Sequence, residues 1–338
     1  ACVIICALIS LATGSSWTTS ATVRIALIGI GKALGVSVGM VAGAVLSGAY
    51  FGDKLSPLSH TTNLAPAMAG ADLFTHIRYM THTTVPSILV TLIVFIILGI
   101  GFSGDGAAKS QELLAAMNEV FTINLLLFIV PIIVIVMIVR KTPPLVALFV
   151  GTILGAIAAL IFQQELLLSL SGESTLSLYG TYHVIIDAIT VSTEIETTSA
   201  ALTDLFQSGG MEGMLGTIWL IICAMVFGGV MDAIGALSTI SAALLSMAQS
   251  TFQLFASTVA SCLAINITAS DQYLSIVVPG KMFEKAYKDR GLAPENLSRT
   301  LEDSGTVTSV LIPWNTCGAY QSGVWGVYVS QYFFYAIF

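Results

Sequence analysis

Two pairs of polar segments interrupt the apolar, membrane-length sequence of this chain in the same order. The first pair is a hydroxyl-rich segment at Thr13–Thr22 and a carboxylate-bearing segment at Gly52–Ser59. The second pair is a polar segment at Thr268–Ser275 and a carboxylate-bearing segment at Glu302–Ser309. Irregular backbone at membrane depth persists only where it is buried in protein or lines a cavity. The duplicated interruption therefore predicts two broken elements that line a path for a solute.

Composition places the rest of the chain in a lipid bilayer. Apolar residues make up 56% of the sequence and charged residues 9%, and the mean hydropathy is +0.91. The 338 residues are enough for about eight or nine membrane-embedded helices of roughly twenty residues each. Both ends fall within apolar runs, at Ala1–Ala12 and Tyr328–Phe338, which indicates truncation at both termini.

Several other classes of function find no support in the sequence. A formal net charge of −7 without a large basic cluster argues against a nucleic-acid partner. The five cysteines form no Cys-x-x-Cys pair and read as small buried hydrophobes. The run Gly29–Gly35 lacks the third glycine of a dinucleotide-binding fingerprint because Leu34 takes its place. No cofactor is predicted.

Charge-poor apolar runs predict four crossings between the two polar pairs, at Pro86–Phe102, Val120–Val139, Pro144–Phe162 and Leu215–Ile234. The resulting organisation has four parts. They are a first repeat core with hairpin and broken helix at 1–84, three linking transmembrane helices at 85–162, a carboxylate-rich non-cytoplasmic segment at 163–213, and a second repeat core at 214–338. The third part contains carboxylates that include Glu196 and Asp204 but no Lys or Arg.

Counting crossings predicts how the repeats are related. If each hydroxyl-rich tip is a re-entrant hairpin and each carboxylate-bearing break interrupts one crossing, four intervening crossings make the two hairpins enter from opposite sides. We therefore expect an all-α polytopic protein of the plasma membrane with inverted structural repeats, two re-entrant helical hairpins and two broken transmembrane helices. The oligomeric state is left open, with a homodimer among the alternatives.

The distribution of basic residues predicts the orientation of these repeats. The side on which they are more numerous is expected to be cytoplasmic. That side holds Arg78, Arg140, Lys141, Lys281, Lys285, Lys288, Arg290 and Arg299, whereas the other holds Arg24, Lys32 and Lys109. An additional crossing at Ala236–Ala248 would change this assignment.

Small residues recur every four positions at Gly31, Gly35, Gly39, Gly43 and Ser47. On a helix this spacing places them on one face, where it allows close approach of a neighbouring helix in lipid. We interpret this face as a packing surface.

The tips and breaks supply the oxygen ligands that a hard cation such as sodium prefers. Pro57 and Pro313 remove backbone donors in the breaks and leave carbonyl groups available. The candidate ion- or substrate-binding residues are Ser15, Ser16, Thr19, Asp53, Ser56, Ser59, Thr62, Asn63, Ser270, Asp271, Asp303, Thr306, Ser309, Asn315 and Thr316.

The carboxylates are the sharpest candidates, because an ionised carboxylate in an apolar stretch needs a partner or a pore. Asp53, Asp271 and Asp303 are the candidate proton carriers, and we hypothesise that Asp53, Ser16 and Asp303 bind sodium. Proton and sodium would compete for one carboxylate, because desolvation disfavours its empty charged form. The alternative for Asp53 is a structural ion pair with the adjacent Lys54.

The run Gly48–Pro66 closely resembles the NhaC-type sodium/proton antiporter family. The segments Gly209–Leu215, Thr217–Ile221 and Leu297–Asp303, and Leu311–Asn315 after them, are similar to that family too. The resemblance implies an ion-transporter-superfamily fold and exchange of sodium for protons by alternating access. Relatives in the family exchange carboxylic acids such as malate and lactate with sodium and proton coupling.

One position departs from the family pattern, which usually has Asp where this chain has His60. Losing an anionic ligand there should weaken cation binding or transfer it to Asp53. The cargo is thus a small inorganic cation, or alternatively a small carboxylic acid. A hydrolase using Ser16 or Ser56 has no supporting motif, and a passive channel would not need two inverted hairpins.

Overall fold

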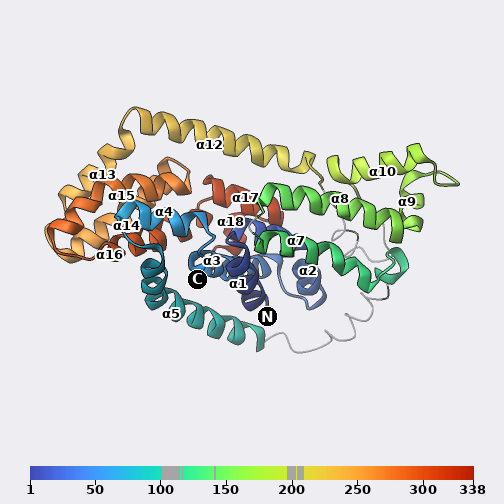
Figure 1. Ribbon diagram of the computed structural model, residues 1–338, viewed down its shortest axis with the longest axis horizontal. Coiled ribbons are helices and arrows are strands. Elements are labelled where there is room, and N and C mark those ends of the chain that lie inside the picture. Colours follow the sequence, from blue (N-terminus) through green and yellow to red (C-terminus); the bar gives the residue numbers. More distant parts are fainter. Residues whose placement is uncertain (101–114, 116, 141, 196–202, 204–208) are drawn as a thin grey trace. The chain divides into compact units, whose positions relative to one another are not determined.

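The computed structural model describes residues 1–100, 115, 117–140, 142–195, 203 and 209–338, which divide into two compact units (Figure 1). The first unit contains Ala1–Arg24, Val38–Gly101 and Gly216–Phe338, and the second contains Ile25–Ser37 and Phe102–Leu215. Regular structure in the described residues is helical, and they contain no β-strand. The predicted all-α class is confirmed. Lys109, Lys141, Glu196 and Asp204 lie outside the described residues.

The first unit contains most of the helices. They are α1 (Cys2–Thr13), the start of α2 (Ser16–Ala33), α3 (Val38–Leu55), α4 (His60–Ala69), α5 (Leu73–Ile100), α12 (Leu215–Ala233), α13 (Ala236–Ser246), α14 (Thr251–Thr268), α15 (Gln272–Asp289), α16 (Pro294–Leu301), the π-helical turn η3 (Glu302–Thr306), η4 (Ser309–Leu311), α17 (Thr316–Trp325) and α18 (Val329–Tyr332). The second unit contains η1 (Leu125–Phe128), α7 (Ile129–Val139), α8 (Pro144–Phe162), α9 (Gln164–Ser171), α10 (Leu178–Thr190) and η2 (Glu212–Met214).

Each predicted polar segment lies where one helix gives way to the next. The tips separate α1 from α2 and α14 from α15, and the breaks separate α3 from α4 and α16 from α17. Gly14 ends α1 with a φ of 67°, a left-handed conformation that glycine adopts without strain. Ile312, which precedes Pro313, has the extended φ of −104° and ψ of 114° that proline imposes on the residue before it. The local sequence therefore stops both helices.

The second tip and break are held by one apolar core. Leu254 and Cys262 of α14, Phe283 of α15 and Leu301 of α16 are completely buried in it. Because α4 also packs against α15 and α16, this core fixes the start of η3 relative to the first break.

Helices α1 and α3 pack tightly against each other at glycines of α3, side by side in blue in Figure 1. A Cβ atom at Gly48 would collide with the backbone of Val3, and one at Gly52 would collide with the backbone of Ala7. Absence of a side chain is therefore what allows the two backbones to approach.

The predicted glycine face is correct only in part. Gly39 and Gly43 do receive close backbone or side-chain contacts, from Gln331 and Tyr335. Gly35, however, lies in the turn between α2 and α3 with a φ of 72°, and no atom of the described residues lies within 4 Å of its Cβ position. The chain turns between the two helices, so the four-residue spacing does not continue along a single helix face.

Substituting Gly48 by valine is expected to destabilise the first unit. The new side chain would overlap the Val3 backbone, and overpacking of this kind costs about 1–3 kcal/mol or more. Thermal unfolding of the purified protein in detergent should show a lower midpoint for Gly48→Val. Gly229→Val, which meets open space on α12, is the matched control and should leave the midpoint near that of the wild type.

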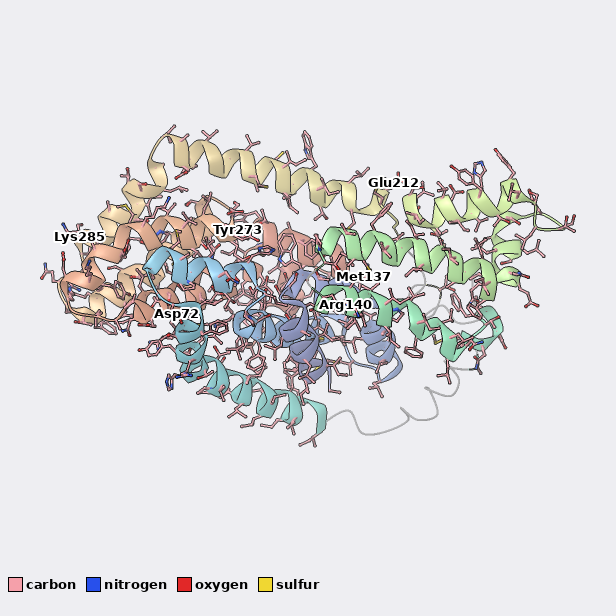
Figure 2. All side chains as sticks on the ribbon, viewed as in Figure 1. Asp72, Met137, Arg140, Glu212, Tyr273 and Lys285 are labelled. Carbon is pink, nitrogen blue, oxygen red and sulfur yellow. The ribbon has the colours of Figure 1, made fainter. Side chains whose placement is uncertain are left out.

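The apolar helices fit a membrane protein. Among the described residues, α5, the segment Glu212–Ala233 and α14 are long and apolar enough to cross a bilayer. Counting α8 and α9 as one span bent by 94° adds a fourth. Large apolar side chains such as Ile96 and Phe227 are exposed along α5 and α12, and the side chains on α12 are almost entirely carbon (Figure 2). Lipid accounts for apolar surface on this scale.

The structure modifies the predicted crossings. α8 has the predicted bounds, α12 ends one residue before Ile234, and α5 contains Pro86–Ile100 but begins at Leu73. The predicted helix over Val120–Val139 is wrong in its first part, because residues 121–124 are not helical and Asn124 caps η1 by accepting from the Leu126 N–H at 3.0 Å. The run at Ala236–Ala248 forms α13, whose 11 residues are too few to span a bilayer.

Candidate functional site

The first tip binds the first break through Asp53. Asp53 lies in the last turn of α3 and is 7% exposed. Its Oδ2 atom accepts hydrogen bonds from both the backbone N–H and the hydroxyl of Ser16, at 3.1 and 2.7 Å. Ser16 begins α2, so two elements that the sequence separates by 37 residues meet at one carboxylate. Bonds from a helix N-terminus and a hydroxyl stabilise its charged form.

The polar residues of the first break surround the end of α3. The Asp53 carbonyl accepts from the Ser56 N–H at 3.1 Å and from the Thr62 hydroxyl at 3.0 Å. Ser59 caps α4, and its hydroxyl lies 3.2 Å from that of Thr61. Ser56, Ser59 and Thr62 are all buried, so the structure brings these three predicted residues to Asp53.

Lys54 extends from the same turn of α3 to the second break. Its ammonium group lies 2.5 Å from Asp303 Oδ1, and the two side chains are 4% and 30% exposed. The predicted alternative paired Lys54 with the adjacent Asp53, but neighbouring residues of a helix do not face each other. Lys54 therefore neutralises Asp303, one of the two carboxylates of the hypothesised sodium site.

A second carboxylate of the π-helical turn was not among the predicted site residues. Glu302 is completely buried, and neither of its carboxyl oxygens has a well-formed hydrogen bond in the part of the chain that the structure describes. Lys54 and Asp53 act on it electrostatically. In the sequence, the acidic pair Glu302-Asp303 at the end of an amphipathic segment indicates that a carboxylate lies here. The sequence does not show which of the two side chains points inward.

The second tip and second break meet in an equivalent way. Ser270 adopts an uncommon positive φ of 58°, and its carbonyl accepts from the Thr316 N–H at 2.9 Å. The Asn315 amide donates to the backbone and side-chain oxygens of Asn266, at 3.1 Å each. Buried Ser309 donates to the Thr306 carbonyl at 2.6 Å. Asn266 was not predicted as a site residue, because a single amide within the apolar α14 reads as a packing residue.

Several predicted site residues have local roles instead. Ser15 and Asp271 cap α2 and α15, accepting from the N–H groups of Thr18 and Leu274. Thr19 is buried, and its hydroxyl oxygen lies 3.3 Å from the hydroxyl oxygen of Thr13. Asn63 is exposed and donates to carbonyl groups of its own break.

Asp53 and Asp271 both act electrostatically on Tyr273, whose side chain is 48% exposed. Tyr273 lies at the start of α15, and Lys285 lies toward the other end of that helix (Figure 2). His60, in the position that departs from the family pattern, is exposed but still acts on Asp53.

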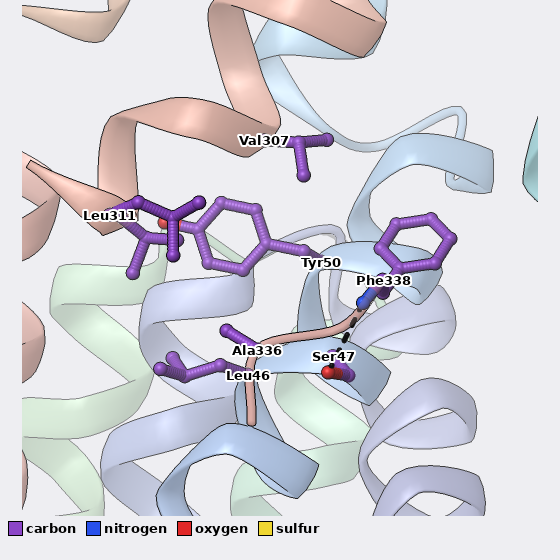
Figure 3. Close-up of a pocket in the computed structure, with 8 residues that line it drawn as sticks. Leu46, Ser47, Tyr50, Val307, Leu311, Ala336 and Phe338 are labelled. Atoms are coloured by element: carbon purple, nitrogen blue, oxygen red, sulfur yellow. Dashed lines mark hydrogen bonds between the residues drawn. The ribbon is translucent and has the colours of Figure 1, made fainter. Parts of the chain in front are cut away.

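A small cavity lies between α3, the segment after η3 and the C-terminal residues. Tyr50, Val307 and Phe338 line it with mainly apolar atoms, and the Ser47 hydroxyl accepts from the Phe338 N–H at its edge (Figure 3). Its volume of about 20 Å³ corresponds to about one water molecule. This cavity is too small for an organic acid.

Comparison with known proteins places the chain in a family. The sequence profile of the Na+/H+ antiporter family matches residues 48–338. The chain belongs to this family. The predicted resemblance to NhaC-type proteins is thereby confirmed. No solved structure matches the chain.

Named relatives of this Na+/H+ antiporter family protein are similar over nearly its whole length. The Na+/H+ antiporter NhaC of Alkalihalophilus pseudofirmus is 38% identical over 99% of this chain and 70% of its own length. NhaC of Bacillus subtilis is 33% identical over 98% of this chain and 71% of its own length. The malate-2H+/Na+-lactate antiporter of Bacillus subtilis is 34% identical over 98% of this chain and 68% of its own length.

Proposed function

We propose that this family member exchanges sodium for protons by alternating access. The observation that carries the proposal is the buried Asp53 carboxylate, held by Ser16 where the first tip meets the first break. A buried carboxylate surrounded by hydroxyl and carbonyl oxygens suits a hard monovalent cation. The NhaC relatives named as Na+/H+ antiporters support the same cargo.

Exchange needs no covalent chemistry at this site. Sodium bound at Asp53 balances the carboxylate, and a proton can replace it when the site is empty, because desolvation disfavours an unbalanced charge. Asp303 is the second exchanging carboxylate of the proposal, and the Lys54 ammonium competes there with sodium. Asp271 remains a candidate proton carrier beside Tyr273.

The proposed architecture consists of inverted repeats in the plasma membrane. The order of tip, helix and broken helix recurs, and the two re-entrant hairpins would enter from opposite sides. Such an arrangement allows one repeat core to open as the other closes. The cytoplasmic side is the one that carries Lys281, Lys285 and Lys288 of α15.

Organic-acid exchange is the alternative, and the malate-2H+/Na+-lactate antiporter supports it by similarity. An anionic substrate would need uncapped helix N-termini at the tips and breaks. Ser59, Asp271 and Asn315 already cap α4, α15 and α17 with their own side chains. This geometry favours the inorganic cation. A hydrolase role for Ser16 is also disfavoured, because its hydroxyl donates to Asp53 and not to a histidine.

Reconstituted vesicles test the proposed function. An imposed sodium gradient should move protons in the opposite direction, whereas an equal potassium gradient should not. Adding malate or lactate, one at a time, should leave the rate unchanged. Proton movement that requires either acid would favour the alternative, and no sodium-driven movement in any condition would refute the proposal.

A further inference from the structure

The backbone of the π-helical turn η3 is well supplied with hydrogen-bond donors. The Asn266 amide donates to the Gly305 carbonyl at 2.8 Å, and the Gln272 amide donates to the Thr306 carbonyl at 3.3 Å. The Thr308 hydroxyl donates to the Ser304 carbonyl. Helices α14 and α15 therefore satisfy this turn with side chains, as expected for polar groups removed from water.

Two side chains of the same turn differ from its backbone in their hydrogen bonding. Glu302 and Thr306 are completely buried, and among the described residues the Glu302 carboxyl oxygens and the Thr306 hydroxyl have no partner at full hydrogen-bond geometry. The Thr61 hydroxyl of α4, which packs against η3, and the Thr306 hydroxyl both lie close to the Glu302 carboxyl group, but neither has the geometry of a well-formed hydrogen bond. A buried carboxyl group that lacks well-formed hydrogen bonds is costly, so an additional ligand is expected here.

We propose that Glu302, Thr306 and Thr61 form a second sodium site, distinct from the one at Asp53 and Ser16. A carboxylate and two hydroxyls are the oxygen ligands that a small hard cation takes. The π-helical geometry supports this role, because π-helical turns occur frequently at functional sites. The proposal goes beyond the proposed function, because sodium binding at Glu302 does not depend on whether the protein exchanges sodium for protons.

The charges around the site fit two cations. Asp303 pairs with the Lys54 ammonium group, and Lys54 and Asp53 both act electrostatically on Glu302. When all four groups are ionised, two negative charges remain unbalanced. One sodium ion at Asp53 and one at Glu302 would neutralise them, whereas with a single sodium ion the other carboxylate would have to be neutralised by a proton.

Equilibrium binding of radioactive sodium to the purified protein tests the proposal. The wild type should bind two ions per chain, and Glu302→Gln should bind one, a loss of half the capacity. Glu284→Gln, at an exposed position of α15, is the matched control and should retain two. A Glu302→Gln protein with the wild-type capacity would overturn the proposal.

A second variant tests the same site in case Glu302→Gln does not fold. Thr306→Val removes one hydroxyl at nearly constant volume and should weaken the second binding event by about tenfold while the first is unchanged. Thr306→Ser should restore it. Equal affinities in Thr306→Val and the wild type would also refute the site. Loss of sodium-driven proton movement in the wild type would refute only the proposed function, since the capacity measurement is independent of it.

Discussion

Replacing Asp53 by asparagine is expected to abolish sodium-driven proton movement in reconstituted vesicles. The amide can still accept from Ser16 at the tip, so the junction of α2 with the first break should persist. The negative charge that balances sodium and accepts a proton is lost, however. Since hydrogen-bond and charge interactions of an ionised group contribute about 1.5–3 kcal/mol, sodium affinity should fall by about tenfold or more.

Asp289→Asn is the matched control for this prediction, because Asp289 is an exposed aspartate at the end of α15. It should exchange at the wild-type rate, and both variants should elute as folded protein in gel filtration. Full activity in Asp53→Asn would remove Asp53 from the mechanism.

Replacing Lys54 by methionine should both destabilise the protein and stop exchange. The substitution leaves Asp303 without its partner and Glu302 without the nearest positive charge. Breaking a fully buried pair costs about 3–5 kcal/mol, and we expect about 2–3 kcal/mol here because Asp303 is 30% exposed and so is partly screened by solvent. The thermal unfolding midpoint in detergent should fall accordingly.

A double-mutant cycle separates the ion pair from other effects. Lys54→Met with Asp303→Asn should be more stable than Lys54→Met alone, because no unpaired carboxylate remains at Asp303. Exchange should not recover in the double variant. Lys285→Met, at an exposed position of α15, should change neither property (Figure 2). Additive losses of stability in the double variant would mean that the pair does not interact.

The helix boundaries near the site were predictable because they depend on local chemistry. Gly14 ends a helix through its left-handed backbone, and Pro313 forces Ile312 into an extended conformation. The predicted crossing over Val120–Val139 failed because its apolar composition conceals the Asn124 cap that begins η1. Hydropathy identifies a stretch that is apolar and long enough to cross a bilayer, but it does not detect a helix cap within that stretch.

The order of amino acids is enough to predict an all-helical member of the Na+/H+ antiporter family with carboxylates placed at duplicated interruptions. Helix propensity and hydropathy depend on residues close together in the chain, and family similarity depends on the order of residues along it. All three can therefore be obtained without coordinates. The contacts between distant segments are visible only in the folded protein, where Ser16 meets Asp53, and Lys54 meets Asp303 across 249 positions. Successive helical residues point in different directions, and long-range packing selects which one turns inward. Packing thus made Glu302 the buried carboxylate and left its neighbour Asp303 partly exposed.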